Sequence, residues 1–273
     1  MSPVESHHPS RAEPKPASLE KAATDRTTPD ARPQPGDEQD ATGEAVGAGP
    51  RVLVIGDSMV VTELGRDLSR IMEAELRATV YRRGKSSTGL ARPDFFDWFA
   101  EAKALTARFE PDLVVVIVGG NDGQDLLNLD GAGRIRWRSG DWASAYSDRV
   151  HAFLDAMSAS GRRFVWIELP AMEHRRLEGK LKLIREVQAH AVSVRQDVLT
   201  HVATAPCFYD SEGHLLTRIP SGAKQGRRIR QEDGIHFSLF GARYVSSCIA
   251  PSLLEAVRQE GVGPSNAENA QRG

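Results

Sequence analysis

The sequence predicts an α/β fold, a three-layer α/β/α sandwich with a central parallel sheet of about five strands. Short, continuous apolar runs alternate along the chain with longer amphipathic stretches. Such apolar runs are typical of strands that are buried on both faces, as in a parallel sheet. Since neighbouring parallel strands need crossover connections, we expect the amphipathic stretches to be helices that cover both faces of the sheet.

The expected strands, of which the last is the weakest, are Val52–Ile55, Thr79–Tyr81, Leu113–Val118, Phe164–Glu168 and Cys207–Tyr209. The expected helices lie near residues 59–77, 93–109, 142–160, 174–202 and 238–258. Two stretches interrupt the alternation. Residues 126–141 predict a hairpin with a strand at Arg134–Arg138, and residues 210–232 form a long connection rich in Arg and Lys. Long connections in compact domains are often functional, so we expect both stretches beside the substrate site. Residues 210–232 are either a lid that contacts an anionic or sugar-rich acyl donor or a solvated loop of exposed cations.

The chain is expected to hold one folded domain, residues 51–258. Residues 1–50 are rich in Pro, Ala, acidic and hydroxyl-bearing residues and have few large apolar ones. They cannot bury enough apolar surface to offset the entropy of ordering, so we expect a disordered tail. Residues 259–273 are expected to be a second disordered tail.

The composition excludes several classes of protein. The net charge of −2 gives no reason to expect nucleic acid as a partner. No His/Cys cluster has the spacing of a zinc site, and no apolar run is long enough for a transmembrane helix. Cys207 and Cys248 lie among apolar residues, so we expect two buried small hydrophobic side chains and not a disulfide framework.

The expected location follows from the first residues, MSPVESHHPSRAEP, which lack the apolar core of a signal peptide. As written, the sequence predicts a soluble, cytoplasmic protein. A Pro/Ala-rich spacer before a catalytic domain is nevertheless common in anchored envelope proteins. A periplasmic or cell-envelope location therefore stays open if the start is truncated or misassigned.

A candidate nucleophile follows the first strand. Gly56-Asp57-Ser58 comes directly after the buried run, and a helical pattern begins at Met59. Ser58 is therefore expected at the carboxyl edge of the sheet, beside the unpaired backbone N–H groups of a helix start. A nucleophilic serine needs such donors, because its attack on a carbonyl creates an oxyanion. The alternative is an ordinary strand end with a helix N-cap.

Two further polar segments are expected at the same edge. Asn121, in Gly-Gly-Asn-Asp after the run Leu113–Val118, can aim its amide at an oxyanion, or can simply form a turn. Asp233 and His236, in Asp-Gly-Ile-His before the last helix, can bond through the imidazole Nδ1. Nε2 of His236 is then free to take a proton from a serine. The alternative for this pair is a capping Asp and a structural His.

Together the three segments resemble the SGNH hydrolase superfamily, also called GDSL esterases, over roughly residues 51–258. The family's first, third and fifth blocks are Gly-Asp-Ser, Gly-x-Asn-Asp and Asp-x-x-His, and they occur here in that order. The string STGLARPDFFDW is similar to a bacterial subfamily whose substrate is unassigned. The resemblance implies the flavodoxin-like SGNH fold and a reaction that requires no metal and no organic cofactor.

The resemblance also implies a serine ester hydrolase that forms an acyl-enzyme on Ser58. His236 is the implied base and Asp233 orients it. The implied oxyanion donors are the backbone N–H groups of Ser58 and Ser87 and the side-chain amide of Asn121.

The second block departs from the family pattern. Counting from the strand puts its donor at Ser87, whereas insisting on a glycine points to Gly84 or Gly89. A backbone donor does not require glycine, only a permissive backbone conformation. The candidate substrate contacts are Gly89, Asp122 and Trp137. Of these, Trp137 lies on the predicted hairpin beside arginines, where its ring could stack on a sugar.

The expected substrate is a small-molecule or polysaccharide ester, because some extracytoplasmic relatives act on O-acetyl groups of polysaccharides or peptidoglycan. Two alternatives stay open. One is an O-acyltransferase that uses the same site, and the other is a catalytically silent carbohydrate-binding module with the SGNH fold. The sequence carries no signal for an oligomeric state.

Overall fold

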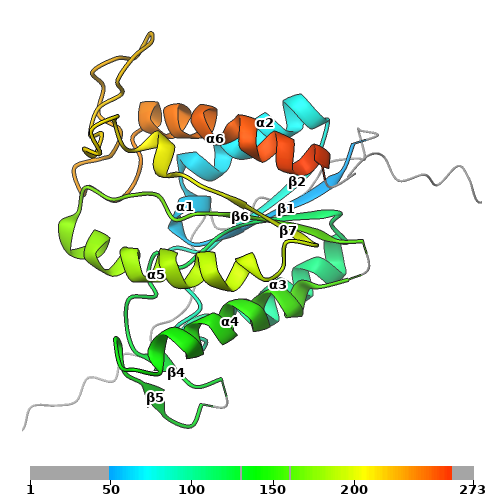
Figure 1. Cartoon of the computed structure of the whole chain (residues 1–273). Coiled ribbons are helices and arrows are strands. Elements are labelled where there is room, and N and C mark those ends of the chain that lie inside the picture. The colour runs from blue at the N-terminus through cyan, green and yellow to red at the C-terminus, as the bar shows by residue number, and fades with distance from the viewer. Residues whose placement is uncertain (1–48, 130, 160, 260–273) are drawn as a thin grey trace, which may run out of the picture. The chain divides into compact units, whose positions relative to one another are not determined.

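Five parallel strands form the centre of the fold, in the order β2-β1-β3-β6-β7 (Figure 1). The computed structural model describes residues 49–129, 131–159 and 161–259. The strands of this sheet are β1 (Arg51–Gly56), β2 (Thr79–Gly84), β3 (Leu113–Ile117), β6 (Arg163–Ile167) and β7 (Leu199–Val202). The inner strands β1 and β3 are buried almost throughout, because each carries a continuous apolar run.

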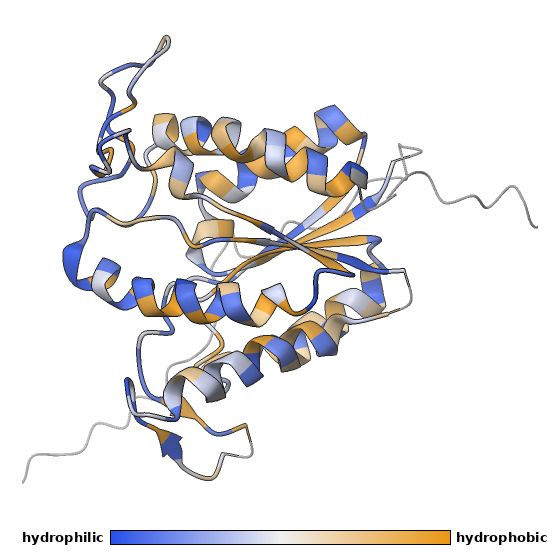
Figure 2. Ribbon diagram, viewed as in Figure 1, coloured by the Kyte–Doolittle hydropathy of each residue, from blue (hydrophilic) through white to orange (hydrophobic). Residues whose placement is uncertain are grey.

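Helices cover both faces of this sheet, which confirms the predicted three-layer sandwich. α2 (Glu63–Leu76) and α6 (Leu239–Gln259) pack together on one face (Figure 1). The other face carries α3 (Trp98–Phe109), α4 (Trp142–Met157) and α5 (Arg175–Ser193). Figure 2 shows hydrophobic residues along the strands and on the sides of the helices that face them. The amphipathic pattern of the sequence is therefore the pattern of the core.

The first helix is interrupted at Thr62. α1 (Ser58–Val61) is a single turn, and the extended backbone of Thr62 separates it from α2. Thr62 Oγ1 donates a hydrogen bond to the carbonyl of Ser58, at 2.8 Å. The sequence predicted one helix over 59–77, because the apolar spacing continues through the interruption.

The fifth strand is not where the sequence predicted it. β7 lies within the predicted helix 174–202, since α5 already ends at Ser193. The predicted strand Cys207–Tyr209 is instead the end of a 3₁₀ turn, η1 (Ala205–Cys207), followed by an isolated bridge from Tyr209 to Leu215. β7 is an edge strand with the sequence LTHV, and only its two end residues are buried. It therefore lacks the continuous apolar run of a central strand.

Two excursions lie on the side of the sheet to which the strands' carboxyl ends point (Figure 1). β4 (Leu126–Leu127) and β5 (Arg134–Ile135) form the predicted antiparallel hairpin, with shorter strands than expected. The long connection between η1 and α6 folds back on itself. Its backbone N–H groups at Ile219 and Ile229 donate to the carbonyls of Arg227 and Thr217, at 2.9 and 3.0 Å.

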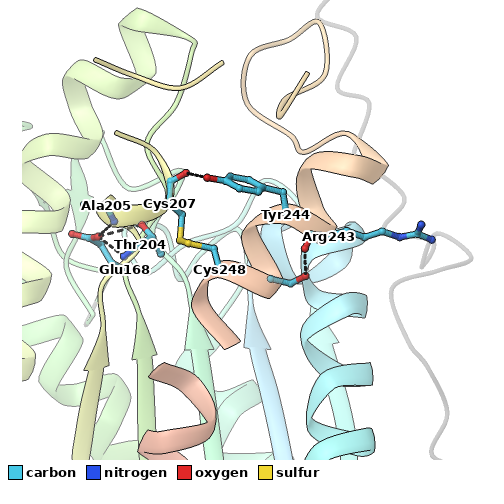
Figure 3. Close-up of a disulfide and its surroundings, with 8 residues drawn as sticks. Glu168, Thr204, Ala205, Cys207, Arg243, Tyr244 and Cys248 are labelled. Carbon is cyan, nitrogen blue, oxygen red and sulfur yellow. Dashed lines mark hydrogen bonds between the residues drawn. A yellow bond between two sulfur atoms is a disulfide. The ribbon is translucent and has the colours of Figure 1, made fainter. Parts of the chain in front are cut away.

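Cys207 and Cys248 form a disulfide (Figure 3), and Cys248 is exposed, so the prediction of two buried small hydrophobic side chains is wrong. η1 and α6 bring the two Cα atoms to 6.0 Å, although the residues are 41 positions apart in the sequence. Tyr244, one turn before Cys248 on α6, donates its hydroxyl to the carbonyl of Cys207 at 3.2 Å. The segment that the disulfide closes contains both Asp233 and His236.

The predicted tails, residues 1–50 and 259–273, lie almost entirely outside the described residues, so the domain boundaries stay a prediction. None of the helices in the described ranges combines the length and the apolar character that crossing a bilayer needs.

Candidate active site

Ser58 is the first residue of α1 and follows β1 directly, at the carboxyl edge of the sheet. Its side chain is half-buried. Within the described ranges, neither its Oγ nor its backbone N–H has a hydrogen-bond partner. β1 and β3 are neighbours at the point where the strand order reverses, which is where ligands bind in open parallel sheets.

Asp57 joins the first sequence block to the third. Its Oδ1 accepts a hydrogen bond from the N–H of Met59 at 3.0 Å, and its Oδ2 accepts one from the N–H of Gly120 at 2.8 Å. Burial raises the pKa of Asp57 from its ordinary value to about 6, although these hydrogen bonds act to lower it. The carboxylate therefore fixes the turn that carries Ser58 against the turn that carries Asn121.

The side chain of Asn121 ties the third block to the second. Its Nδ2 donates to the carbonyl of Thr88 at 2.8 Å, and the second N–H of the half-buried amide has no partner in the described part of the chain. Thr88 is itself held in place, because its Oγ1 accepts from Trp98 Nε1 at 2.8 Å and donates to the carbonyl of Lys85 at 2.6 Å. Asn121 thus bonds a distant backbone group and not its own turn.

The second block presents free backbone donors beside Asn121. Ser87 is exposed and has a left-handed φ of 62°. In the part of the chain that the structure describes, the N–H groups of Ser87, Thr88 and Gly89 have no hydrogen-bond partner. Gly84 has a different role, since a Cβ there would lie 2.7 Å from the backbone N of Val61. It lets β2 pass close to α1.

Asp122 is fully buried, so it cannot make the substrate contact that the sequence suggested. Its Oδ2 accepts from the N–H of Leu90 (2.9 Å) and the hydroxyl of Tyr146 (2.7 Å), and its Oδ1 accepts from the N–H of Ala91 (2.8 Å). A Cβ on Gly89 would lie 2.0 Å from this Oδ1, so only glycine fits there. Burial raises the pKa of Asp122. The carboxyl group positions the second block and does not line the open site.

Asp233 and His236 are hydrogen-bonded as their spacing predicted, with 2.7 Å between Asp233 Oδ2 and His236 Nδ1. Asp233 Oδ1 also accepts the N–H groups of Ile235 (2.8 Å) and His236 (3.0 Å). Burial acts to raise the pKa of Asp233, but the hydrogen bonds from Ile235 and His236 outweigh it, and the pKa is lowered. An ionised Asp233 favours the tautomer with the proton on Nδ1.

Nε2 of His236 has no hydrogen-bond partner among the described residues, and no hydrogen bond there joins it to Ser58. Catalytic hydrogen bonds are often loose without substrate and tighten only when it binds.

Arg230 is a positioning residue that sequence reasoning missed. It is 2% exposed and lies over the rings of Phe237 and Phe208, at 4.3 and 5.4 Å from the centroids. Its guanidinium donates to the carbonyls of Ile235 and Ala171, which ties the Asp-x-x-His turn to the segment after β6. Burial lowers the pKa of Arg230 to about 10. In the sequence it is one cation of a basic run, and nothing local marks it as buried.

Trp137 lies on the hairpin side of the site and is half-buried. Its ring packs edge-on against Trp142, with 4.4 Å between centroids, and its backbone N–H donates to Asp125 at 2.8 Å. Among the residues that the structure describes, no group of His, Cys, Asp and Glu side chains is arranged to hold a metal ion.

Three solved structures illustrate what the fold is similar to. A lipase/acylhydrolase from Enterococcus faecalis is 16% identical, covers 80% of this chain and 100% of its own, and gives a TM-score of 0.52. A GDSL-like lipase from Bacteroides thetaiotaomicron is 13% identical, with coverages of 76% and 89% and a TM-score of 0.51. A carbohydrate esterase family 3 protein from Talaromyces cellulolyticus is 13% identical, with coverages of 77% and 99% and a TM-score of 0.50.

At these identities the likeness concerns the fold, and it confirms the fold that the three sequence blocks implied. No curated protein matches the sequence significantly. The family described as "Protein of unknown function (DUF459)" matches residues 51–252, which is most of the chain. The chain therefore belongs to the DUF459 family and has the fold of the SGNH, or GDSL-type, hydrolases.

Proposed function

We propose that this chain is a serine ester hydrolase of the SGNH type, which cleaves acyl esters through an acyl-enzyme on Ser58. The observation that carries the proposal is the arrangement at the carboxyl edge of the sheet. Among the residues that the structure describes, the Ser58 hydroxyl next to the Asn121 block has no hydrogen-bond partner, and Nε2 of His236, whose ring Asp233 orients, has none either. A serine hydroxyl is a weak nucleophile until a positioned base takes its proton.

In the acylation step, Ser58 Oγ attacks the ester carbonyl carbon and its proton passes to Nε2 of His236. Asp233 accepts the Nδ1–H bond and stabilises the imidazolium. The carbonyl oxygen becomes negative and accepts hydrogen bonds from the N–H groups of Ser58 and Ser87 and from the second amide N–H of Asn121. The C–O bond of the ester then breaks, and His236 returns the proton to the leaving alcohol.

In the deacylation step, water attacks the acyl carbon and His236 takes one of its protons. The bond to Ser58 breaks, the acid leaves, and the proton returns to Ser58 Oγ. The scheme itself requires no metal and no organic cofactor. If a sugar hydroxyl took the place of water, the same residues would transfer the acyl group instead of hydrolysing it.

O-acetyl groups on a polysaccharide or on peptidoglycan are the substrates that we propose. The carbohydrate esterase among the similar structures supports this class, as does the half-buried Trp137 beside the site. Product analysis with O-acetylated sugars, with and without an acceptor sugar, separates hydrolysis from transfer. Free acetate alone indicates hydrolysis, whereas an acetylated acceptor indicates transfer.

The nucleophile is tested with p-nitrophenyl acetate and a fluorophosphonate probe. Ser58→Ala should lose turnover and labelling while keeping the circular dichroism and melting temperature of a folded protein. His236→Ala should lose turnover almost as far, because the two residues act as a unit. Ser86→Ala is the matched control, since this exposed serine precedes Ser87 in the sequence and has no role in the scheme. Near-normal kcat in Ser58→Ala would discard the serine mechanism.

A further inference from the structure

Beyond Asn121, a groove continues from the second block toward the hairpin. A pocket of about 200 Å³ is lined by Ser87, Thr88 and Gly89, together with Arg92 and Gln124. A second pocket, of about 340 Å³, is lined by the same Arg92 and Gln124 and by hairpin and α5 residues. Since the two pockets share lining residues, they adjoin, and the groove runs from the proposed oxyanion donors to the hairpin.

Three cations line the pocket at the hairpin end, and they come from three different parts of the chain: Arg92 follows the second block, Arg134 lies on β5 and Lys180 lies on α5. Asp125 is the acidic residue that lines the same pocket, and its Oδ1 already accepts the backbone N–H of Trp137. The pocket therefore carries an excess of positive charge around an aromatic side chain.

Counting only the residues that the structure describes, two of these cations retain unused hydrogen-bond donors. Lys180 Nζ donates to the carbonyl of Gly123 at 2.7 Å, which uses one of its three N–H groups. The guanidinium of Arg134 has no hydrogen-bond or ion-pair partner in the described ranges. Arg92 differs, because two short bonds to Asp94, at 2.7 and 2.6 Å, compensate its charge. The charge available to a ligand thus comes from Arg134 and Lys180.

The position of Lys180 is set by close packing. Its side chain crosses the turn that follows Asn121, and a Cβ on Gly123 would lie 2.7 Å from its Cδ. Glycine at position 123 lets the ammonium reach the carbonyl under it, while the aliphatic stem is partly buried. Lys180 is therefore held over the groove, unlike a cation that extends freely into solvent.

We propose that this pocket binds a negatively charged group of the substrate, a carboxylate or phosphate on a sugar, with the sugar ring beside Trp137. Ammonium and guanidinium groups make strong, charge-assisted hydrogen bonds to such oxygens. The inference rests on the proposed function, since it names the class of ester that the same groove would accept. The substrate is then an acylated saccharide that is itself anionic, and contacts remote from the ester orient it for attack.

Binding is measured first, without turnover, by calorimetry on the full chain carrying Ser58→Ala. The three probes are an oligosaccharide of galacturonic acid, the neutral galactose oligosaccharide of the same length, and glucose 6-phosphate. At least one anionic probe should bind about tenfold or more tightly than the neutral one. Preference for the uronate identifies a carboxylate as the recognised group, and preference for the phosphorylated sugar identifies a phosphate.

Variants locate the contact. Arg134→Gln and Lys180→Gln should each weaken binding of the preferred anion by about tenfold, because each removes a charged donor. Arg136→Gln is the matched control, since it removes an exposed cation from the same hairpin that does not line the pocket. It should leave the affinity unchanged. Equal affinity for all three probes, no binding of any of them, or equal losses in all three variants would overturn the proposal.

The two proposals fail in different ways. If the unmodified chain does not hydrolyse p-nitrophenyl acetate but the anionic probe binds and the variants behave as expected, the hydrolase proposal fails and the anion site stands. If p-nitrophenyl acetate is hydrolysed but no probe shows the expected preference, the anion site fails and the hydrolase proposal stands.

Discussion

Replacing both Cys207 and Cys248 by alanine should lower the free energy of unfolding by about 2–4 kcal/mol. The cross-link restricts the unfolded chain, and its effect grows with the length of chain that it closes. For a separation of 41 residues, the loop-entropy relation gives about 4 kcal/mol. Measured effects often fall below this value, because unfolded chains keep residual structure and because strain offsets part of the gain.

Turnover should survive this change at temperatures well below the melting point. The closed segment contains Asp233 and His236. However, the turn that carries them is held by Arg230, which donates to Ile235 and Ala171. These contacts do not involve either sulfur. We therefore expect a kcat for p-nitrophenyl acetate close to that of the unmodified chain.

The free energy of unfolding is measured by urea unfolding of the two proteins, with and without a reductant. In thermal unfolding, each kcal/mol lost lowers the melting temperature of a domain of this size by about 2–4 °C, so the melting temperature should fall by roughly 4–16 °C. Reductant should lower the unfolding free energy of the unmodified chain to that of the double variant, and it should leave the double variant unchanged.

Structural disulfides form in oxidising compartments. Protein made in a bacterial cytoplasm should therefore titrate two free thiols after denaturation, and protein exported to a periplasm none.

Two results would refute this reasoning. Equal unfolding free energies for oxidised and reduced protein would mean that the cross-link does not stabilise the fold. A folded double variant with a large loss of kcat would show that the disulfide, and not Arg230, positions Asp233 and His236.

Three further predictions concern the donor side of the site. Asn121→Ala should lower kcat by on the order of 10²-fold with little change in KM. Asn121→Asp keeps the size of the side chain but has no N–H to donate, so it should lower kcat by a similar factor. The native pKa of Asp57 is about 6 and its ordinary value is 3.8, so the native state binds more protons between these values and loses stability as the pH rises through them. The free energy of unfolding of Asp57→Asn, measured by urea titration, should therefore rise relative to that of the unmodified chain by up to about 3 kcal/mol between about pH 4 and pH 7. A difference in unfolding free energy that does not change with pH would contradict this. Gly89→Ala should destabilise the chain by about 1–3 kcal/mol, because its Cβ would overlap the buried Asp122, whereas Gly179→Ala, where a Cβ meets nothing within 4 Å, should not.

The sequence predicted those parts of the fold that are encoded locally. Ser58 and Asn121 follow apolar runs that are buried on both faces, and a buried run of this kind signals both a strand and the edge at which it ends. Asp233 and His236 needed only their spacing of three residues. β7 was missed because an edge strand buries few residues, so its short alternating pattern was absorbed into the neighbouring helix.

The features that escaped prediction depend on contacts between distant parts of the chain. The disulfide joins residues 41 positions apart, and neither cysteine has a local feature that marks a partner. Asp122 stands next to Asn121 and was taken for a substrate contact, yet it is fully buried. Arg230 was counted with the cations of its loop, yet it is buried against two aromatic rings. Burial of a charged side chain is a property of the tertiary structure, and residue type alone does not reveal it.

Asp57 and Asp122 have parallel roles. Asp57 accepts the N–H of Gly120 and so links the first block to the third, and Asp122 accepts the N–H groups of Leu90 and Ala91 and so links the third block to the second. Burial raises the pKa of both, which means that the fold bears a solvation cost at each.

That cost is consistent with a site whose donors must be held in place before charge develops, because preorganised donors need no rearrangement during the reaction. The donor side of the site is thus one hydrogen-bonded frame that runs through Asp57, Asn121 and Asp122. His236 belongs to a second frame, which Arg230 ties to the segment after β6. No hydrogen bond among the described residues joins Ser58 to His236. Changes in the first frame should therefore act on oxyanion stabilisation, and changes in the second on proton transfer.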